Sequence, residues 1–139
     1  MNDDGLRWPL GDAAEAGVCR IDRTEVETLC DAGRAAGLHC ARLDLEAFHG
    51  KADLLAGLAH ELRFPSWFGH NWDALADCLD DLGWLKASGY ILVLENPAGL
   101  SNTVPKDYAL ALDILADAAR KWRERGTPFW VFVVAKEKK

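Results

Sequence analysis

Two carboxylates, Asp73 and Asp77, lie four positions apart in a segment with helical periodicity, and no basic residue follows them before Leu82. Side chains at this spacing share one helix face, where like charges repel by about a few tenths of a kcal/mol. The positive end of the helix dipole favours Asp73, whereas Asp77 lies too far from the helix start. Such a pair, just after Trp67 and Gly69, could dock into a cationic cleft, because carboxylates accept charge-assisted hydrogen bonds as phosphates do.

Two other interpretations of the same segment are open. Acidic helix faces are usually only solvated, and nearby aromatic residues often belong to the core. Alternatively, His70, Asp73 and Asp77 could form an acid–base set. The sequence offers no nucleophile paired with a base, no metal-ligand spacing and no glycine-rich phosphate loop. We therefore predict that the chain is not an enzyme and has no cofactor and no metal. The four cysteines form no Cys-x-x-Cys pair, so we expect them to be reduced and mostly buried.

Composition narrows the class of protein. The chain has 139 residues, of which 50% are hydrophobic and 27% charged, as in a single globular domain. A net charge of −6 argues against direct nucleic-acid binding, which relies on phosphate neutralisation, and permits a basic protein partner. The longest apolar run, at 128–135, is too short for a membrane helix, and the acidic start does not look like a signal peptide. We expect a cytoplasmic protein without membrane contact.

Helical and strand-like periodicities alternate along the chain. Strands are predicted at 18–21, 38–45, 90–94 and 129–135. Helices are predicted from Thr24 onward and at 51–62, 71–82 and 107–125, with loops at 63–70 and 96–105. This alternation favours an α/β fold in which helices pack against a small parallel β-sheet.

Local signals define the ends and faces of these elements. Thr24 and Glu27 have the spacing of a capping box, and Asn71 is a natural N-cap. Trp72 shares a predicted core stripe with the leucines at 75, 79 and 82, so Trp72→Ala should cost about 3–5 kcal/mol as a core truncation. Residues 1–16 lack periodicity, and we expect a loose arm that is fixed by Trp8.

The run WFGHNWDALADCL, from Trp67 to Leu79, resembles the central signature of the barstar family, the intracellular inhibitors of ribonucleases such as barnase. The family pattern is two aromatics, Gly, any residue, Asn, any residue, Asp-Ala-Leu, any residue and Asp-Cys-Leu. Every defined position of this pattern agrees. The resemblance implies three parallel strands with packed helices within 38–139, the barstar-like domain. Residues 1–37 would form an N-terminal extension that could add a fourth strand, giving one compact domain overall.

The resemblance also implies a function and a binding site. Asp77 would occupy the phosphate site of a ribonuclease, and Asp73 would pair with an arginine on the enzyme. Trp67 and the backbone of Gly69 would pack on a catalytic histidine. The other partner-binding positions that the resemblance implies are Asn71, Ala76 and Trp84.

Two positions depart from the family pattern. Ala76 replaces an interface tryptophan, and Lys121, in a basic helix end with Arg120, Arg123 and Arg125, stands where the family has an acid. We therefore expect a basic ribonuclease other than barnase, of a secreted or toxin type. The alternative is a barstar-fold binding or immunity module directed at a non-nuclease partner, because fold alone does not separate these functions.

Overall fold

The structure, a computed structural model, describes residues 8–134 of the chain. Its helices are α1 (Val26–Ala35), α2 (Lys51–Glu61), α3 (Trp72–Asp81), α4 (Ala98–Thr103) and α5 (Pro105–Glu124). Its strands are β1 (Val18–Ile21), β2 (Leu38–Asp44), β3 (Gly89–Glu95) and β4 (Phe129–Val134), and short 3-10 turns are η1 (Ala13–Glu15) and η2 (Arg23–Glu25). None of the helices described is both long and apolar enough to cross a membrane.

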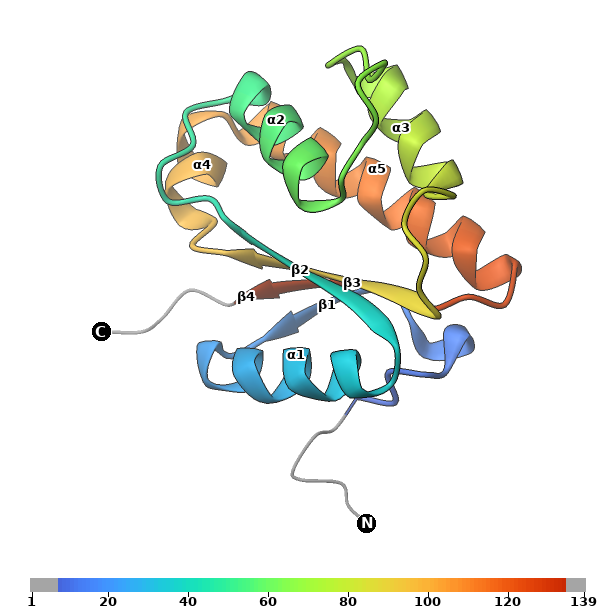
Figure 1. Ribbon diagram of the computed structural model, residues 1–139. Helices are drawn as coiled ribbons and strands as arrows, with labels where there is room; N and C mark the ends of the chain where they lie inside the picture. Colours follow the sequence, from blue (N-terminus) through green and yellow to red (C-terminus); the bar gives the residue numbers. More distant parts are fainter. Residues whose placement is uncertain (1–7, 135–139) are drawn as a thin grey trace.

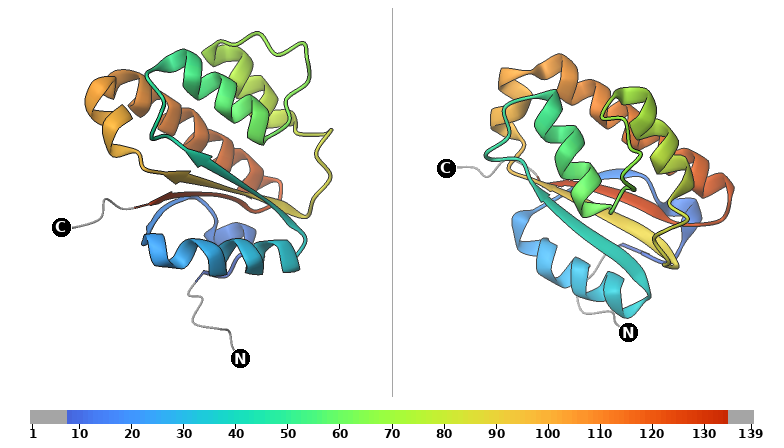
Figure 2. Two further views of the ribbon diagram at one scale, coloured as in Figure 1. Left: turned by 60° about the vertical axis from the view of Figure 1, so that its left-hand side comes forward. Right: turned by 45° about the horizontal axis from the view of Figure 1, so that its top comes forward.

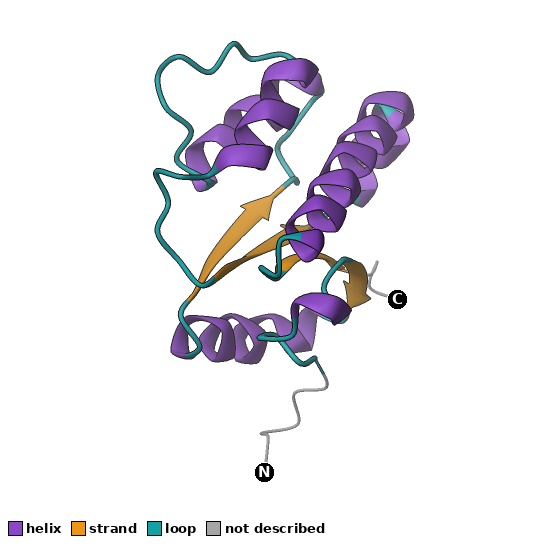
Figure 3. Cartoon of the chain, turned by 90° about the vertical axis from the view of Figure 1, so that its right-hand side faces the viewer, coloured by secondary structure: helices purple, strands orange, loops and turns teal. Residues whose placement is uncertain are grey.

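The strands form one parallel sheet in the order β1-β4-β3-β2 (Figure 1). The steps from β2 to β3 to β4 run across the sheet in one direction, whereas the step from β1 to β2 runs in the opposite direction. Right-handed crossovers then place the two sets of helices on opposite faces. Figures 1 and 2 show α1 on one face and α2, α3 and α5 on the other, and Figure 3 shows helices on both sides of the strands. The predicted α/β fold with a parallel sheet is confirmed.

Two hydrophobic clusters, one on each face of the sheet, hold these layers together. Leu92 and Val131 belong to the cluster under α2, α3 and α5, while Val93 and Trp130 belong to the cluster under α1. Strands β3 and β4 are therefore covered on both faces, which explains why their sequences are continuous apolar runs.

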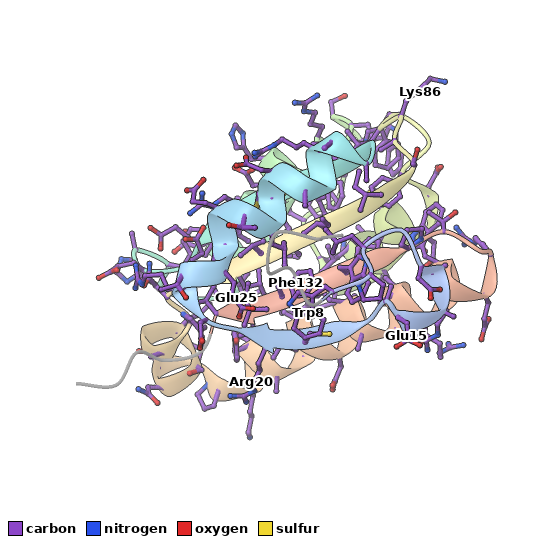
Figure 4. The ribbon with its side chains drawn as sticks, turned by 90° about the horizontal axis from the view of Figure 1, so that it is seen from below. Trp8, Glu15, Arg20, Glu25, Lys86 and Phe132 are labelled. Carbon is purple, nitrogen blue, oxygen red and sulfur yellow. The ribbon has the colours of Figure 1, made fainter. Side chains whose placement is uncertain are left out.

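The chain before Leu38 is part of this architecture. The fourth strand that we expected from this region is present, since β1 pairs with β4 along its whole length. The prediction of a loose arm at 1–16 is wrong for residues 8–16, which contain η1 and the buried Leu10, and its first seven residues lie outside the described range. Trp8 does fix this segment, as predicted, because its ring meets that of Phe132 edge-on at 5.3 Å (Figure 4). The indole nitrogen of Trp130 donates to the carbonyl of Leu10 at 2.9 Å. Residues 8–37 thus cover one face of the sheet.

The predicted capping box of Thr24 and Glu27 is wrong. Asp22 is the N-cap of η2, which leads into α1, and its amide donates to Glu25 Oε1 at 2.9 Å. Glu27 binds Arg42 instead, with an Nη1–Oε2 distance of 2.7 Å. Glu25 follows Asp22 by three residues, and Glu27 follows Thr24 by three residues, so spacing alone does not show which capping box forms. The structure shows the pair of Asp22 with Glu25, while Glu27 is engaged by β2.

The predicted loop at 96–105 is also wrong, because it contains α4, and α5 begins at Pro105 rather than at position 107. Most residues of α4 (AGLSNT) are poor helix formers, so local propensity does not predict a helix here. Leu100 is nevertheless 1% exposed in the core, and this tertiary contact overrides propensity. Pro105 suits the first turn of α5, where its missing amide costs nothing.

Candidate functional site

Helix α3 begins where the sequence predicts. The side chain of Asn71 accepts a hydrogen bond from the amide of Ala74 at 2.8 Å, which confirms Asn71 as the N-cap. The other end of the same side chain donates from Nδ2 to the carbonyl of Gly69 at 3.2 Å. Asn71 therefore ties the loop before α3 to the first turn of the helix. This bond fixes the exposed backbone of Gly69 relative to the acidic face that follows.

The four carboxylates of α3 are not equivalent. Asp80 binds Lys121, with an Nζ–Oδ2 distance of 3.4 Å, and Asp81 accepts from the amide of Gly83 at 3.0 Å. Asp73 and Asp77 are exposed and make no hydrogen bond or ion pair with any residue in the range 8–134. The result is a pair of like charges on one helix face whose hydrogen-bonding capacity is available to a partner.

The basic end of α5 does not form the free cationic surface that the sequence suggested. Arg125 Nη1 donates to the carbonyl of Asp80 at 2.6 Å, and the indole nitrogen of Trp122 donates to that of Leu79 at 2.7 Å. The guanidinium of Arg125 also lies over the Trp122 ring, 4.4 Å from its centroid. These groups satisfy carbonyls at the C-terminus of α3, where cations are favoured by the helix dipole.

The other cations in the last turns of α5 also bind groups of the protein. Arg120 binds Asp117 at 2.7 Å and Glu124 at 3.0 Å, and Arg123 donates to the carbonyl of Ala16 at 2.8 Å. The hydrogen bonds that Lys121 donates to Asp117 and to Asp80 raise its pKa, which keeps this side chain charged. The cations at the end of α5 are therefore bound within the protein, and Lys121 supports α3 through Asp80. The sequence missed this support because Lys121 and Asp80 are far apart in the chain.

Aromatic rings form a connected row beside α3. Trp67 is 64% exposed and meets Trp84 edge-on at 6.1 Å. Trp84 in turn meets Phe64 edge-on at 6.1 Å and donates from its indole nitrogen to the carbonyl of Leu62 at 3.1 Å. Phe64 contacts the buried Phe68 at 4.9 Å. The outermost ring, Trp67, is thus attached to the core through half-buried aromatics.

The predicted partner-binding residues fall into two groups. The first group is exposed along the loop and the first turns of α3 and consists of Trp67, Gly69, Asn71, Asp73 and Asp77. Ala76 and Trp84 are half-buried, and Trp84 reaches the surface beside Trp67. The structure therefore brings the predicted positions onto one loop, one helix face and one aromatic row. Cys78 lies on the opposite, core side of α3 at 0% exposure, and burial raises the pKa of its thiol.

Trp72 is not the core residue that its spacing predicts. Leu75, Leu79 and Leu82 are buried, but Trp72 is half-buried, and Lys51 lies over its ring with Nζ 5.5 Å from the centroid. At the first turn of α3, Trp72 lies at the edge of the helix surface that packs against the core.

We therefore expect Trp72→Ala to reduce the free energy of unfolding by about 1–2 kcal/mol, less than a full core truncation. Leu79→Ala, at a fully buried site on the same helix, should cost about 2–5 kcal/mol. Urea denaturation of both variants measures the difference. A larger loss for Trp72→Ala than for Leu79→Ala would contradict this assignment of the helix faces.

Metal-binding and thiol groups contribute nothing recognisable to this site. The part of the chain that the structure describes holds no group of three or more His, Cys, Asp or Glu side chains arranged to bind a metal ion. The four cysteines are free, with Cys30 and Cys78 buried and Cys19 and Cys40 half-buried. The chemistry available at the surface of α3 is therefore that of charge, hydrogen bonding and aromatic contact.

Comparison with known proteins adds one finding. None of the curated proteins compared with the chain matches it. Residues 38–134 match the protein family described as Barstar (barnase inhibitor). The match starts at β2 and ends with β4, so it includes α3 and leaves out β1 and α1. It spans well over half of the chain, and the chain therefore belongs to the barstar family.

Proposed function

We propose that this chain is an intracellular inhibitor that blocks the active site of a basic ribonuclease with α3 and the loop before it. The observation that carries the proposal is the state of Asp73 and Asp77. Both are exposed on one face of α3 and have no partner among the described residues, whereas Asp80 on the same helix is paired. Family membership supports a role as an inhibitor rather than an enzyme.

The chemistry of the two partners is complementary. A ribonuclease active site must hold cationic groups for the phosphates of RNA, and the carboxylates of Asp73 and Asp77 can accept hydrogen bonds from the same groups. Buried charge pairs are stable only when their hydrogen bonds are satisfied, so the cations of the enzyme would have to meet these carboxylates directly. A net charge of −6 would also accelerate encounter with a basic enzyme.

The row of aromatic rings borders the face of α3 that carries Asp73 and Asp77, and its rings are held by contacts with one another. Trp67 offers a large exposed ring, and its edge-on contact with Trp84 limits its motion before binding. Less conformational freedom is then lost on complex formation. Arg120 and Lys121 at the end of α5 are paired with carboxylates, which reduces their repulsion of a basic enzyme. The half-buried Ala76 leaves less contact area than a tryptophan, which favours a partner other than barnase itself.

The experiment is a capture from extracts and secreted fractions of the source organism, followed by an RNA cleavage assay. The baits are the wild type, the double variant Asp73→Ala/Asp77→Ala and the control Asp31→Ala. Asp31 is 77% exposed on α1, on the other face of the sheet, so its replacement removes charge away from the site. Barnase serves as a purified reference enzyme.

We expect the wild type and Asp31→Ala to capture a basic ribonuclease and stop its activity at equimolar ratio, and the double variant to do neither. A captured nuclease that both the wild type and the double variant inhibit would place the binding site outside α3. A captured partner without nuclease activity, bound through Asp73 and Asp77, would support the alternative of a binding or immunity module for another target.

A further inference from the structure

A second surface, remote from the acidic pair on α3, has the form of a peptide-binding groove. It is a cavity of about 500 Å³ between the outer edge of β2 and one face of α2. Three residues of the strand line it, namely Arg42, Leu43 and Asp44. The helix side includes Ala56, Gly57, His60 and Glu61. Figures 1 and 2 show β2 at the border of the sheet with α2 beside it. An open strand next to a helix is the geometry in which extended peptides add to a sheet.

The strand side of the groove carries unused backbone groups. The amide of Leu45 donates to the carbonyl of Glu95 at 2.9 Å, in register with the pairing of β2 and β3. Since consecutive peptide groups of a strand point to opposite sides, those of Cys40, Arg42 and Asp44 face away from β3. They have no hydrogen-bond partner among the residues described. The edge of β2 is therefore open along its second half.

The floor of the groove is apolar and packs closely against a glycine of α2. A Cβ atom at Gly57 would lie 2.7 Å from Phe48 Cζ and 2.9 Å from Leu43 Cδ1. Glycine at this position lets the Phe48 ring lie close to α2. Leu43 is buried and Phe48 half-buried, so together they give a surface for one or two apolar side chains of a bound segment.

The charges around the groove define the chemistry of the occupant. Glu61 has no ion-pair partner within 8–134, and Asp44 and Asp53 accept only hydrogen bonds from uncharged groups. The one arginine of the lining, Arg42, is already bound by Glu95 at 2.8 Å and by Glu27 at 2.7 Å. The lining thus holds the carboxylates of Asp44, Asp53 and Glu61 against one guanidinium and the imidazole of His60, although Arg23 also lies near enough to act on Asp44. This excess of carboxylates would attract lysine or arginine.

We propose that this groove binds an extended, lysine- or arginine-containing segment of a partner protein, which pairs with the open edge of β2 as an additional strand. Backbone groups of the segment would bond Cys40, Arg42 and Asp44. Its apolar side chains would contact Phe48, and its cations would meet Glu61 and its acidic neighbours. This surface lies on α2 and β2, so it could be occupied independently of α3.

The test is amide hydrogen exchange on the ¹⁵N-labelled full chain, with two synthetic peptides as probes. One peptide is acetyl-Thr-Lys-Val-Lys-Val-Thr-amide, and the other carries Glu in place of Lys. At about 1 mM lysine peptide, a concentration suited to weak peptide binding, we expect exchange at Cys40, Arg42 and Asp44 to slow at least about tenfold. Exchange at Ala41 and Leu43, whose amides face β3, should not change, and the glutamate peptide should have no effect.

A pair of variants controls the site. Ala56→Lys places a cation in the groove at an exposed helix position and should abolish the protection by the lysine peptide. Ala109→Lys makes the same change at an exposed position of α5, outside the groove, and should leave the protection intact. Unchanged exchange at the three edge amides would overturn the proposal. So would a response confined to α3, or edge protection that rises with protein concentration in the absence of peptide, which would identify a second copy as the occupant.

Discussion

Replacing Asp77 with alanine should weaken binding to the partner ribonuclease by at least about 2 kcal/mol, the loss that marks an interface hot spot. The cationic groups of the enzyme would be buried against α3 without their counter-charge, and an unpaired buried charge is costly. Because Asp77 bonds to no other described residue, the free energy of unfolding should stay constant or rise slightly as repulsion from Asp73 disappears. Isothermal titration calorimetry and urea denaturation measure the two quantities separately.

Two variants separate a specific contact from general attraction. Asp77→Asn keeps the shape of the side chain and removes its charge, so it should lose nearly as much affinity as Asp77→Ala. Asp31→Ala changes the net charge equally on the opposite face of the sheet and should change affinity by less than about 0.5 kcal/mol. Equal losses for Asp77→Ala and Asp31→Ala would mean that only net charge matters. An affinity of the wild type that does not fall with added salt would also count against electrostatic capture.

Removing residues 1–37 should prevent the remaining chain from folding, although the family match begins only at position 38. The deletion takes away β1, which pairs with β4, and α1, which covers the sheet face that holds Ile91, Trp130 and Phe132. Each large apolar side chain exposed in this way costs about 1.5–3 kcal/mol, and a whole domain is stable by only about 5–15 kcal/mol. We infer that residues 8–37 are an integral layer of one domain. Circular dichroism, dye binding and urea denaturation of the truncated chain measure the effect.

A point variant of α1 serves as the control for this deletion. Leu29→Ala removes a fully buried side chain of α1 and should cost about 2–5 kcal/mol while leaving a cooperative unfolding transition. The truncated chain should instead lose near-ultraviolet circular dichroism and bind hydrophobic dye. A truncated chain that unfolds cooperatively at the urea midpoint of the full chain would show that residues 38–139 form an independent domain.

The features that the sequence predicts correctly depend on local patterns. The continuous apolar runs of β3 and β4 predict strands that are covered on both faces, and Asn71 before a helical stripe predicts the start of α3. The acidic pair could also be found, because Asp73 and Asp77 lie on one helix within a short motif. Periodicity alone did not separate the half-buried Trp72 from the buried leucines, since the border of a packed face depends on its neighbours.

The features that the sequence does not predict depend on contacts between distant segments. The pairing of Lys121 with Asp80 and the bond from Trp122 to the carbonyl of Leu79 join α5 to α3, and no pattern within either helix indicates them. The burial of Leu100 makes α4 a helix against its propensity. Asp22 rather than Thr24 is the cap, and Glu27 instead binds Arg42 of β2, a residue far away in the chain.

The position of β1 beside β4 has a consequence for synthesis. β1 is made before the other three strands of the sheet and pairs with β4, the last of the four in chain order, as in the register of Val18 with Val131. Contacts between such distant segments form late and slow folding, because the intervening chain must first be ordered. β2, β3 and the helices between them can associate during translation, but the other edge of β3 stays unpaired until β4 arrives. The sheet would therefore be complete only after β4 has been made.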